Sequence, residues 1–415
     1  LGINASYAMC KATGLSNNSL GRVQTPVLAA ISRRYREREN HISSDSWPIY
    51  ISLQKDGILF KMRRTQDLPD KESATMFFQD CKLSHQAQIT GISHSVKEIL
   101  PPDLLDLTQL QKEANIRYGY TASEVYDIAQ SLYEKKLISY PRTSSRYLTE
   151  DVFDSLPPIM ARLLSWELFP AAKGTGGIDI SNLSRHVISA EKANVHHAII
   201  ITGIRPGNLS EKEMQVYRLV AGRMLETFMA PCRIETTNVE AVCAAQHFKA
   251  EQTRIIEAGW HDVFMRSDMV PKSGYSVNEL PEVEKGDNLN VCGCNMVHKK
   301  ELPVDPFTDA ELVEYMELNG LGTVSSRTNI IRTLVNRKYI RYSGKYIVPT
   351  PKGMFTYETI RGKKIADTSL TADWEKQLTG LESGMITGQD FLNRIRTLAK
   401  EMTDDIFNTY STKEE

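Results

Sequence analysis

The sequence places a helical block between two strand-rich segments, and this order constrains the fold more than any other feature. From Trp47 to Val96, and again from Thr236 to Val291, the chain has short extended pieces such as WPIYISLQ and NVEAVCAA. Between these segments the apolar residues recur at helical spacing. The simplest physical account is a discontinuous β domain into which a helical domain is inserted.

Capping boxes mark where helices begin. In each box a Ser or Thr is followed three residues later by Glu. The side chain of each of these two residues accepts a hydrogen bond from the backbone N–H of the other. The boxes start at Thr121, Ser210 and Thr308, and the first two open helices of the inserted block. Pro101-Pro102 breaks the chain ahead of that block and predicts the first domain boundary. Near the start of the chain, apolar residues at helical spacing from Val23 predict a further helix.

The C-terminal part is helical again from Thr308 onward. The helix that begins there ends near Gly320, a typical C-terminal cap, and a second helix runs from about Ser325 to Lys338. The stretch YIRYSGKYIVPT then predicts a β-hairpin that turns at Ser343-Gly344. Helix, helix and hairpin in this order are typical of a winged helix. A last pair of helices follows.

Composition excludes several classes of protein. A length of 415 residues suggests two to four domains at roughly 150 residues each. With 41% hydrophobic and 24% charged residues, the chain is neither disordered nor fibrous. No apolar run approaches the ~18–20 residues of a membrane span. The net charge is only -1, so a role in binding nucleic acid must come from local clusters of charge.

The sequence predicts neither a structural metal site nor a nucleotide-binding loop. The six cysteines are scattered, and Cys292-Gly293-Cys294 lacks a second pair or nearby histidines at zinc spacing. Reduced thiols in a cytosolic protein are the expectation. The glycine-rich stretch from Lys173 to Gly177 is not followed by the Lys-Ser/Thr of a P-loop, so it predicts a plain loop.

The stretch LISYPRTSSRYL, residues 137–148, is the sharpest candidate for chemistry. Tyr140 follows the end of a predicted helix, and Arg142 and Arg146 come two and six residues after it. A tyrosine beside guanidinium groups can act as the nucleophile of a phosphoryl transfer, because positive charge activates the phenol and the arginines bind phosphate oxygens. On spacing alone the alternative is a half-buried strand tyrosine beside surface arginines.

A second candidate lies between Leu318 and Tyr357, a segment without Asp or Glu. It carries seven basic residues, namely Arg327, Arg332, Arg337, Lys338, Arg341, Lys345 and Lys352. Tyr339, Tyr342 and Tyr346 are interleaved with them. An acid-free run with aromatics on a helix and a hairpin favours contact with a nucleic-acid backbone and stacking on its bases. The alternative is a solvated face.

The residues around Tyr140 resemble the nucleophile motif of type IA DNA topoisomerases, which is usually ISYPRTDS-RYL. Other motifs follow in the family's order over nearly the whole chain. LGINAS at 1–6 resembles LVGINxS/T, SLGRVQTP at 19–26 resembles SxGRVQTP, HHAII at 196–200 resembles HxAIIPT, and GLGTVSSR at 320–327 resembles GIGTPATR. HHAII and SYPRT point to the topoisomerase III branch.

This resemblance implies a multidomain α+β fold, a toroidal body with winged-helix-like α domains and a discontinuous β arch. The domains it implies are a base of residues 1–46 and 301–415, an arch of residues 47–104 and 232–300, and an inserted α domain of residues 105–231. By resemblance the ring opens when the DNA is cut and lets another strand pass. No ATP is needed, because the phosphotyrosine bond conserves the energy.

The resemblance also implies roles for single residues. Tyr140 would attack a phosphodiester of single-stranded DNA and hold the 5′-phosphate covalently, and Arg142 would bind the scissile phosphate. His196 would contact DNA phosphate near the active site, the alternative being a hydrogen-bonded core histidine. The expected nucleic-acid-binding residues are Arg22, Gln24, Arg146, Arg327, Arg332, Arg337 and Arg341.

The sequence departs from the family pattern in two places. Ser144 stands where Asp usually follows YPRT, which predicts lower activity. The Toprim domain, whose acidic cluster binds Mg²⁺ in the full enzyme, would precede Leu1, so we expect a piece of a longer protein that is inactive alone. The expected partners are single-stranded DNA and that Toprim domain, with no membrane, in the bacterial cytoplasm and associated with the nucleoid.

Alternative functions remain open. A relative that naturally lacks the Toprim domain would bind single strands without cutting them, and the sequence upstream of Leu1 would distinguish the two cases. Another tyrosine DNA-cleaving enzyme is the second alternative. A relaxase needs His-x-His on a strand, which the chain lacks, and a recombinase needs a different set of Arg and His residues.

Overall fold

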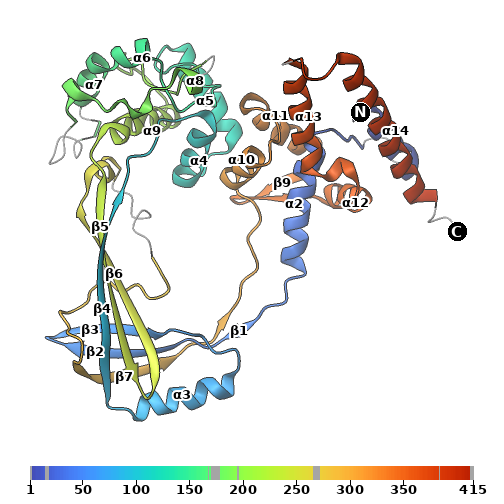
Figure 1. Ribbon diagram of the computed structural model, residues 1–415. Coiled ribbons are helices and arrows are strands. Elements are labelled where there is room, and N and C mark those ends of the chain that lie inside the picture. Colours follow the sequence, from blue (N-terminus) through green and yellow to red (C-terminus); the bar gives the residue numbers. More distant parts are fainter. Residues whose placement is uncertain are drawn as a thin grey trace.

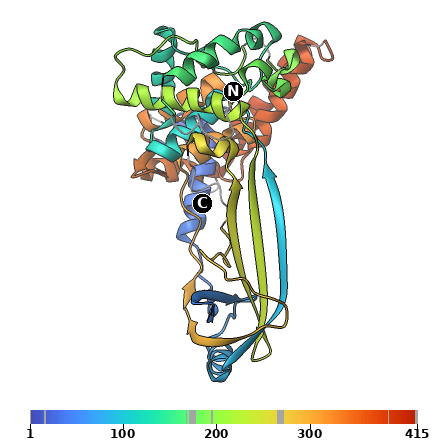
Figure 2. The same cartoon turned by 90° about the vertical axis from the view of Figure 1, so that its left-hand side faces the viewer.

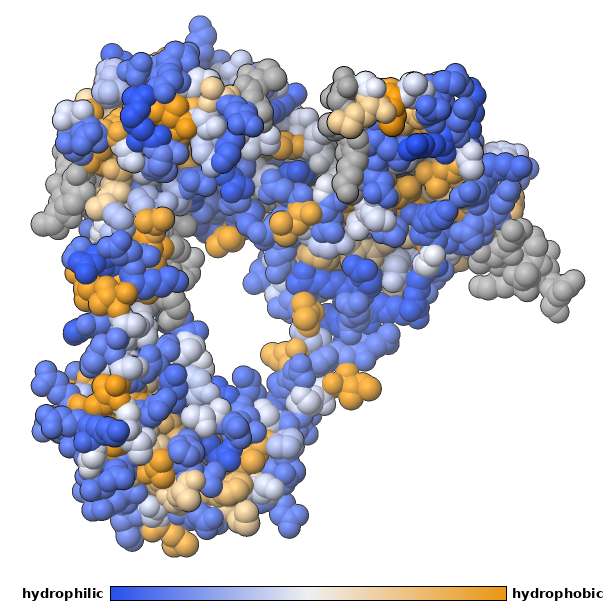
Figure 3. Space-filling model, viewed as in Figure 1, coloured by the Kyte–Doolittle hydropathy of each residue, from blue (hydrophilic) through white to orange (hydrophobic). Residues whose placement is uncertain are grey.

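The computed structural model of the chain describes residues 2–14, 18–166, 168–169, 178–193, 196–264, 272–382 and 384–411. Figure 1 shows three bodies, which we call the arch (bottom), the insert (the helical body above it) and the base (the helical body beside the insert). Figure 3 shows an opening between them, so the three bodies together form a ring. The loop predicted at Lys173–Gly177 lies outside the described residues.

The arch is a closed antiparallel barrel. Its strands are β2 (Ile49–Lys55), β3 (Ile58–Arg64), β4 (Gln86–Ile99), β5 (Cys232–Cys243), β6 (Gln246–Glu257) and β7 (Asn288–Met296), in the order β2-β3-β6-β5-β4-β7. Strands that precede the insert therefore pair with strands that follow it, chiefly β4 with β5. The β2–β3 hairpin turns at Asp56 and Gly57, which both have positive φ, as a two-residue turn requires.

The strands β4, β5 and β6 extend beyond the barrel as a long ribbon that leads to the insert (Figure 2). β4 has 14 residues, which span roughly 45 Å at about 3.3 Å each. Ala87 and Ile89 at its start are buried in the barrel core, whereas the part from Ser93 to Glu98 is exposed. The ribbon therefore holds the insert away from the barrel.

The insert has a core of its own. Its elements are α4 (Leu107–Tyr118), α5 (Ala122–Glu134), α6 (Glu150–Asp154), α7 (Leu156–Ser165), α8 (Ala190–Ala193) and α9 (Glu211–Phe228), with 3₁₀ turns at Ile180–Asn182 and Arg185–Val187; a third turn, Gly259–Val263, packs against α9. Every residue of α9 from Val216 to Phe228 is buried except Arg218. The capping boxes predicted at Thr121 and Ser210 are both formed, and they open α5 and α9.

The base contains the elements from both ends of the chain. They are α1 (Gly2–Thr13), α2 (Gln24–Glu39), α10 (Asp309–Leu318), α11 (Val324–Asn336), β9 (Ile340–Ser343), β10 (Tyr346–Pro349), α12 (Pro351–Ile360), the 3₁₀ turn Lys364–Ala366, α13 (Thr368–Glu382) and α14 (Gly388–Ser411). The predicted order of helix, helix and hairpin is found, and the Thr308 capping box opens α10. The pair β1 (Asp45–Ser46) and β8 (Lys299–Lys300) joins the two segments that connect the base to the arch.

Outside the inserted helical block, sequence patterns did not predict α1, α3 (Lys71–Leu83) and α12. α3 packs against β7 of the barrel, yet only Ala74 and Cys81 on it are buried. An apolar stripe this narrow does not stand out beside strand-like neighbours. The mixed α+β fold is as predicted, and the exact boundaries between arch, insert and base stay a prediction.

Gly353 offers a test of the packing inside the base. It lies in the first turn of α12, where a Cβ atom would be 2.0 Å from the carbonyl oxygen of Tyr339. We expect Gly353→Ala to lower the free energy of unfolding by about 1–3 kcal/mol, because the backbone must move. Thermal unfolding followed by circular dichroism measures the change. The control Gly388→Ala adds a Cβ with no atom within 4 Å, and equal midpoints for the two variants would contradict the close approach.

Candidate active site

Tyr140 lies just after a short extended segment that pairs with another part of the insert. Beyond α5, Lys136 has a φ of 60°, and this left-handed residue turns the chain back. Ile138 then forms an antiparallel bridge with Ile201. The N–H of Ser139 donates to the carbonyl oxygen of Ile200 at 2.8 Å, and the Ser139 hydroxyl accepts from the N–H of Ile200 at 3.0 Å. This pairing brings the predicted nucleophile beside the predicted histidine motif.

The rings of Tyr140 and His196 are in contact, with centroids 4.5 Å apart and planes inclined by 47°. Tyr133 packs edge-on against the other side of Tyr140 at 5.4 Å. The hydroxyl of Thr143 donates to the carbonyl oxygen of His196 at 2.8 Å and holds that residue in place. Within the described part of the chain, the Tyr140 hydroxyl has no hydrogen-bond partner. Phenol and imidazole thus share one partly open patch.

Arg142 leaves one of its donors unused beside this patch. Its Nη2 donates to Oε1 of Gln130 at 3.2 Å, and its guanidinium lies over the ring of Tyr126 at 5.1 Å. The Nε of Arg142 is buried and has no hydrogen-bond partner among the described residues. A buried N–H without an acceptor is costly, and an anionic oxygen bound at the site would satisfy it.

Arg146 and Arg327 both form hydrogen bonds with residues at the beginning of α4. The Nε of Arg146 donates to Oδ2 of the buried Asp106 at 2.7 Å. Nη1 of Arg327 donates to the hydroxyl of Thr108 at 2.9 Å and lies 3.5 Å from a carboxylate oxygen of Glu317. Arg327 is only 8% exposed. Binding of nucleic acid by Arg327 stays a prediction; in this structure its guanidinium is buried beside Glu317 and Thr108.

Three further predicted residues lie on the base near the start of α2. Nη1 of Arg337 donates to the hydroxyl of Ser19 at 2.7 Å and to Oε1 of Gln24 at 2.9 Å. The guanidinium of Arg22 lies over the ring of Trp374 on α13 at 5.1 Å. Gln24 and Arg337 are therefore in direct contact near the start of α2, and Arg22 packs against α13.

Arg332 and Arg341 have different surroundings. Arg332 donates to the hydroxyl of Ser123 at 2.9 Å and pairs with Asp127 at 2.8 Å, so it bridges from α11 to α5 of the insert. Arg341 on β9 is exposed, and within the described residues it has no hydrogen bond or ion pair. Of the arginines in the acid-free run, Arg341 and the exposed Arg337 face solvent most openly.

Tyr339 is not available for base stacking, which corrects the interpretation made from the sequence for this residue. Tyr339 is completely buried in the core of the base, and its hydroxyl bonds to the backbone of Ser19. The phenol of Tyr342 donates to Asp309, and that of Tyr346 donates to Asp305 at 2.8 Å.

The model of one protein family, described as DNA topoisomerase, matches residues 1–393 of the chain. The chain belongs to the DNA topoisomerase family. It is 30% identical to DNA topoisomerase 3 of Bacillus licheniformis, over 98% of this chain and 59% of the relative. It is also 30% identical to DNA topoisomerase 1 of Methanocaldococcus jannaschii, over 100% of this chain and 53% of the relative.

The fold of this topoisomerase chain resembles a solved structure, the full-length topoisomerase I of Thermotoga maritima. The TM-score is 0.73 at 23% identity, and the match covers 98% of this chain and 66% of the other. The predicted type IA fold and family are thereby confirmed. The chain spans about 59% of the length of its Bacillus licheniformis relative and less of the archaeal one.

The described part of the topoisomerase chain has no group of three or more His, Cys, Asp or Glu side chains that could hold a metal ion. In the same part of the chain, no helix is long and apolar enough to cross a membrane.

Sequence reasoning missed the polar contact between insert and base. Asp309, at the start of α10, accepts the N–H of Ala122 at the start of α5 at 3.1 Å. In return, Oδ1 of Asn115 on α4 accepts the N–H of Ala310 at 3.3 Å. Lys112 pairs with Glu314 at 2.6 Å close by. The free N–H groups of two helix N-termini are thus satisfied from the opposite body, and no local sequence pattern announces such a pairing.

Asp309 gives this contact a pH dependence. Burial raises the pKa of its carboxyl to about 6, although the Ala122 N–H and the Tyr342 hydroxyl both donate to it; the charge of Glu124 raises the pKa further. The folded protein therefore holds this proton more tightly than the unfolded chain does. The contribution of Asp309 to the free energy of unfolding is full below about pH 4 and decreases by about 3 kcal/mol as the pH rises through about 6.

Asp309→Asn tests this titration. The amide oxygen can accept the same two hydrogen bonds and carries no charge, so we expect the variant to gain stability over the wild type as the pH rises from about 4 to about 7.5. Urea unfolding at both pH values measures the difference. A difference that is the same at the two pH values would contradict a titration of Asp309 inside the contact.

Proposed function

We propose that this chain is the body of a type IA, topoisomerase III-like enzyme that cuts and rejoins single-stranded DNA through Tyr140. The observation that carries the proposal is the unpartnered phenol of Tyr140 in ring contact with His196, in a chain of the DNA topoisomerase family. The unused Nε of Arg142 beside it supports a phosphate as the ligand of the site.

The reaction that suits these residues is a transesterification. The phenol oxygen of Tyr140 forms a bond to the phosphorus of a phosphodiester, and the bond from phosphorus to the 3′-oxygen breaks. The phenol loses its proton, and the leaving 3′-oxygen gains one. Arg142 and His196 would bind the charged oxygens, where they stabilise the developing negative charge. The 5′-phosphate stays on Tyr140 until the 3′-hydroxyl attacks in reverse, so no ATP is consumed.

Strand passage requires the ring to open, and the contact between insert and base is suited to that step. It includes exchangeable polar partners such as Asp309 with Ala122, Asn115 with Ala310 and Arg332 with Asp127. Water can replace such partners at little net cost, whereas separating a large apolar core would be expensive. The cut strand would be pulled apart as the insert moves, and a second strand would enter the ring for relaxation or decatenation.

The residues that bind the metal ion for this reaction would lie elsewhere in the full-length protein. We propose a Toprim domain that binds Mg²⁺, because the chain spans only part of its relatives and its described residues hold no metal cluster. The bound metal would supply electrostatic stabilisation of the reacting phosphate. The chain alone would then bind single-stranded DNA but not relax supercoils. We place such a protein in the bacterial cytoplasm, at the nucleoid.

A non-catalytic single-stranded DNA-binding module is the alternative. The lack of a metal cluster among the described residues favours it for the isolated chain. The two functions differ in one product, a DNA strand that stays attached to Tyr140 after denaturation.

Tyr140→Phe, in the protein joined to its Toprim domain, tests the proposal. The substitution removes one oxygen and little contact area, so we expect the covalent DNA adduct to disappear while the affinity for single-stranded DNA changes less than about twofold. Gel electrophoresis in denaturant measures the adduct, and fluorescence anisotropy measures the affinity. Tyr133→Phe, which alters the neighbouring exposed phenol, is the matched control and should keep the adduct. An adduct that persists in Tyr140→Phe would assign the nucleophile to another tyrosine.

A further inference from the structure

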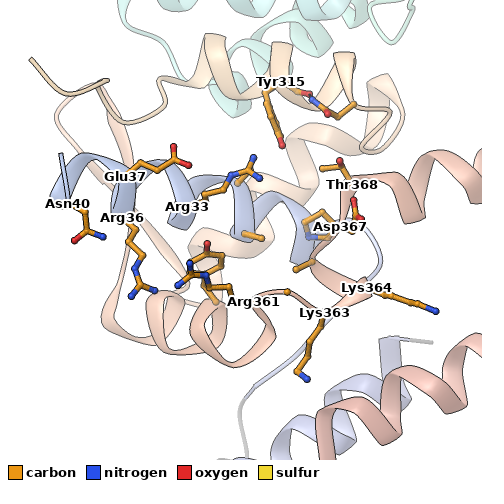
Figure 4. A pocket seen from close by; sticks show the side chains of 17 residues that line it. Arg33, Arg36, Glu37, Asn40, Tyr315, Arg361, Lys363, Lys364, Asp367 and Thr368 are labelled. Atoms are coloured by element: carbon orange, nitrogen blue, oxygen red, sulfur yellow. The ribbon is translucent and has the colours of Figure 1, made fainter. Parts of the chain in front are cut away.

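The base contains a basic cavity that the proposed reaction does not use. It has a volume of about 1010 Å³ and lies between α2, the end of α10 and the segment that joins α12 to α13. Figure 4 shows Arg33, Arg36 and Glu37 projecting from α2, with Tyr315 above them and Arg361 on the opposite side. The cavity is large enough for a chain-like or drug-sized ligand.

Positive charge dominates the lining. The basic residues are Arg33, Arg36, Arg361, Lys363 and Lys364, and the acidic ones are Glu37 and Asp367. One of the acids is already engaged, because Oδ1 of Asp367 accepts the N–H of Ser369 and caps the start of α13. Such a lining attracts an anion with more than one charge.

Two of these arginines have no counter-charge. Arg36 pairs with Glu358, Lys363 with Asp405 and Lys364 with Glu401. By contrast, neither Arg33 nor Arg361 forms a hydrogen bond or ion pair within the part of the chain that the structure describes, and both are exposed. Glu37, one turn from Arg33, forms no ion pair with it among those residues. Two free guanidinium groups on facing segments can each bind a phosphate oxygen pair.

The cavity continues the surface to which a DNA strand is expected to bind. α2 begins two residues after Arg22, and Arg33 lies about 14 Å further along its axis at 1.5 Å per residue. Arg22 lies over Trp374 of α13, and Thr368 at the start of α13 lines the cavity. A strand that contacts Arg22 can therefore reach the cavity along the same two helices.

We propose that this cavity binds the phosphate backbone of a DNA strand outside the reacting segment, held chiefly by Arg33 and Arg361. Tyr315, which is partly exposed in the lining, offers aromatic surface for a sugar or base. The inference rests on the proposed function, since it supposes that the chain binds single-stranded DNA. It adds a second contact that carries part of the affinity without touching the Tyr140 site.

The experiment compares the chain with its Arg33→Gln/Arg361→Gln variant. Binding of a fluorescein-labelled oligothymidylate is followed by anisotropy between about 50 and about 200 mM salt. Each lost phosphate contact on a single strand flattens the slope of log affinity against log salt by about 0.7, so we expect a change of about 1.4. If the affinities converge near 1 M salt, binding at about 50 mM is roughly 50-fold weaker.

The matched control is Arg205→Gln/Arg254→Gln, which removes the same charge from exposed sites on the insert and the arch. It should keep the wild-type slope, and circular dichroism checks that both double variants are folded. If Arg33→Gln/Arg361→Gln keeps the wild-type slope of log affinity against log salt, the cavity does not bind the strand. The proposed function is not affected by that result. Failure of the wild-type chain to bind the strand at all overturns both.

Competition separates the strand from small phosphate ligands. Inorganic pyrophosphate and ATP, added at constant ionic strength, should not displace the oligothymidylate at micromolar concentration. If they do so in the wild type but not in the double variant, the cavity is a site for a small phosphate compound, and the strand proposal is wrong.

Discussion

The pairing of β4 with β5 is the interaction on which the rest of the structure depends. These strands come from either side of residues 100–231, and they pair in antiparallel register from Gln88 with Val242 to Ile99 with Cys232. An antiparallel pair makes the chain leave and return at the same end of the ladder, so both ends of the insert are anchored at one point. The ladder closes the barrel at one end and carries the insert at the other, as Figure 2 shows.

The insert is connected to the rest of the chain only through the ribbon. The contact between the insert and the base therefore decides whether the ring is closed. Each body has its own apolar core, and Ala122 is the residue of the insert that joins the buried core of the base. Hydrogen bonds and ion pairs also join α4 and α5 to α10 and α11. Because water can replace these polar partners, we propose that the ring opens there.

The same contact explains why several expectations for single arginines needed the tertiary structure. Arg327 and Arg332 lie on α11, a helix with no acidic residue, which on sequence alone favours a surface facing DNA. Arg327 pairs with Glu317 on the neighbouring helix α10, and both arginines also bond to residues of the insert, which are distant from α11 in the sequence. A charge pattern read along one helix cannot include the charges of a helix that packs against it from another body. Arg341, on the exposed strand β9, meets no such partner among the described residues.

By itself the sequence determined what depends on near neighbours. Capping boxes placed the starts of α5, α9 and α10, because N-cap and N3 side chains act within one turn. The motif around Tyr140 identified the candidate nucleophile, and the hairpin of β9 and β10 followed from its turn residues. Only the tertiary structure decided the ring contact of His196 with Tyr140, the burial of Tyr339, and the position of Asp309 at the N-terminus of α5. These contacts depend on how whole helices pack, and packing is set by the combined shape of several elements rather than by the residues adjacent to each group.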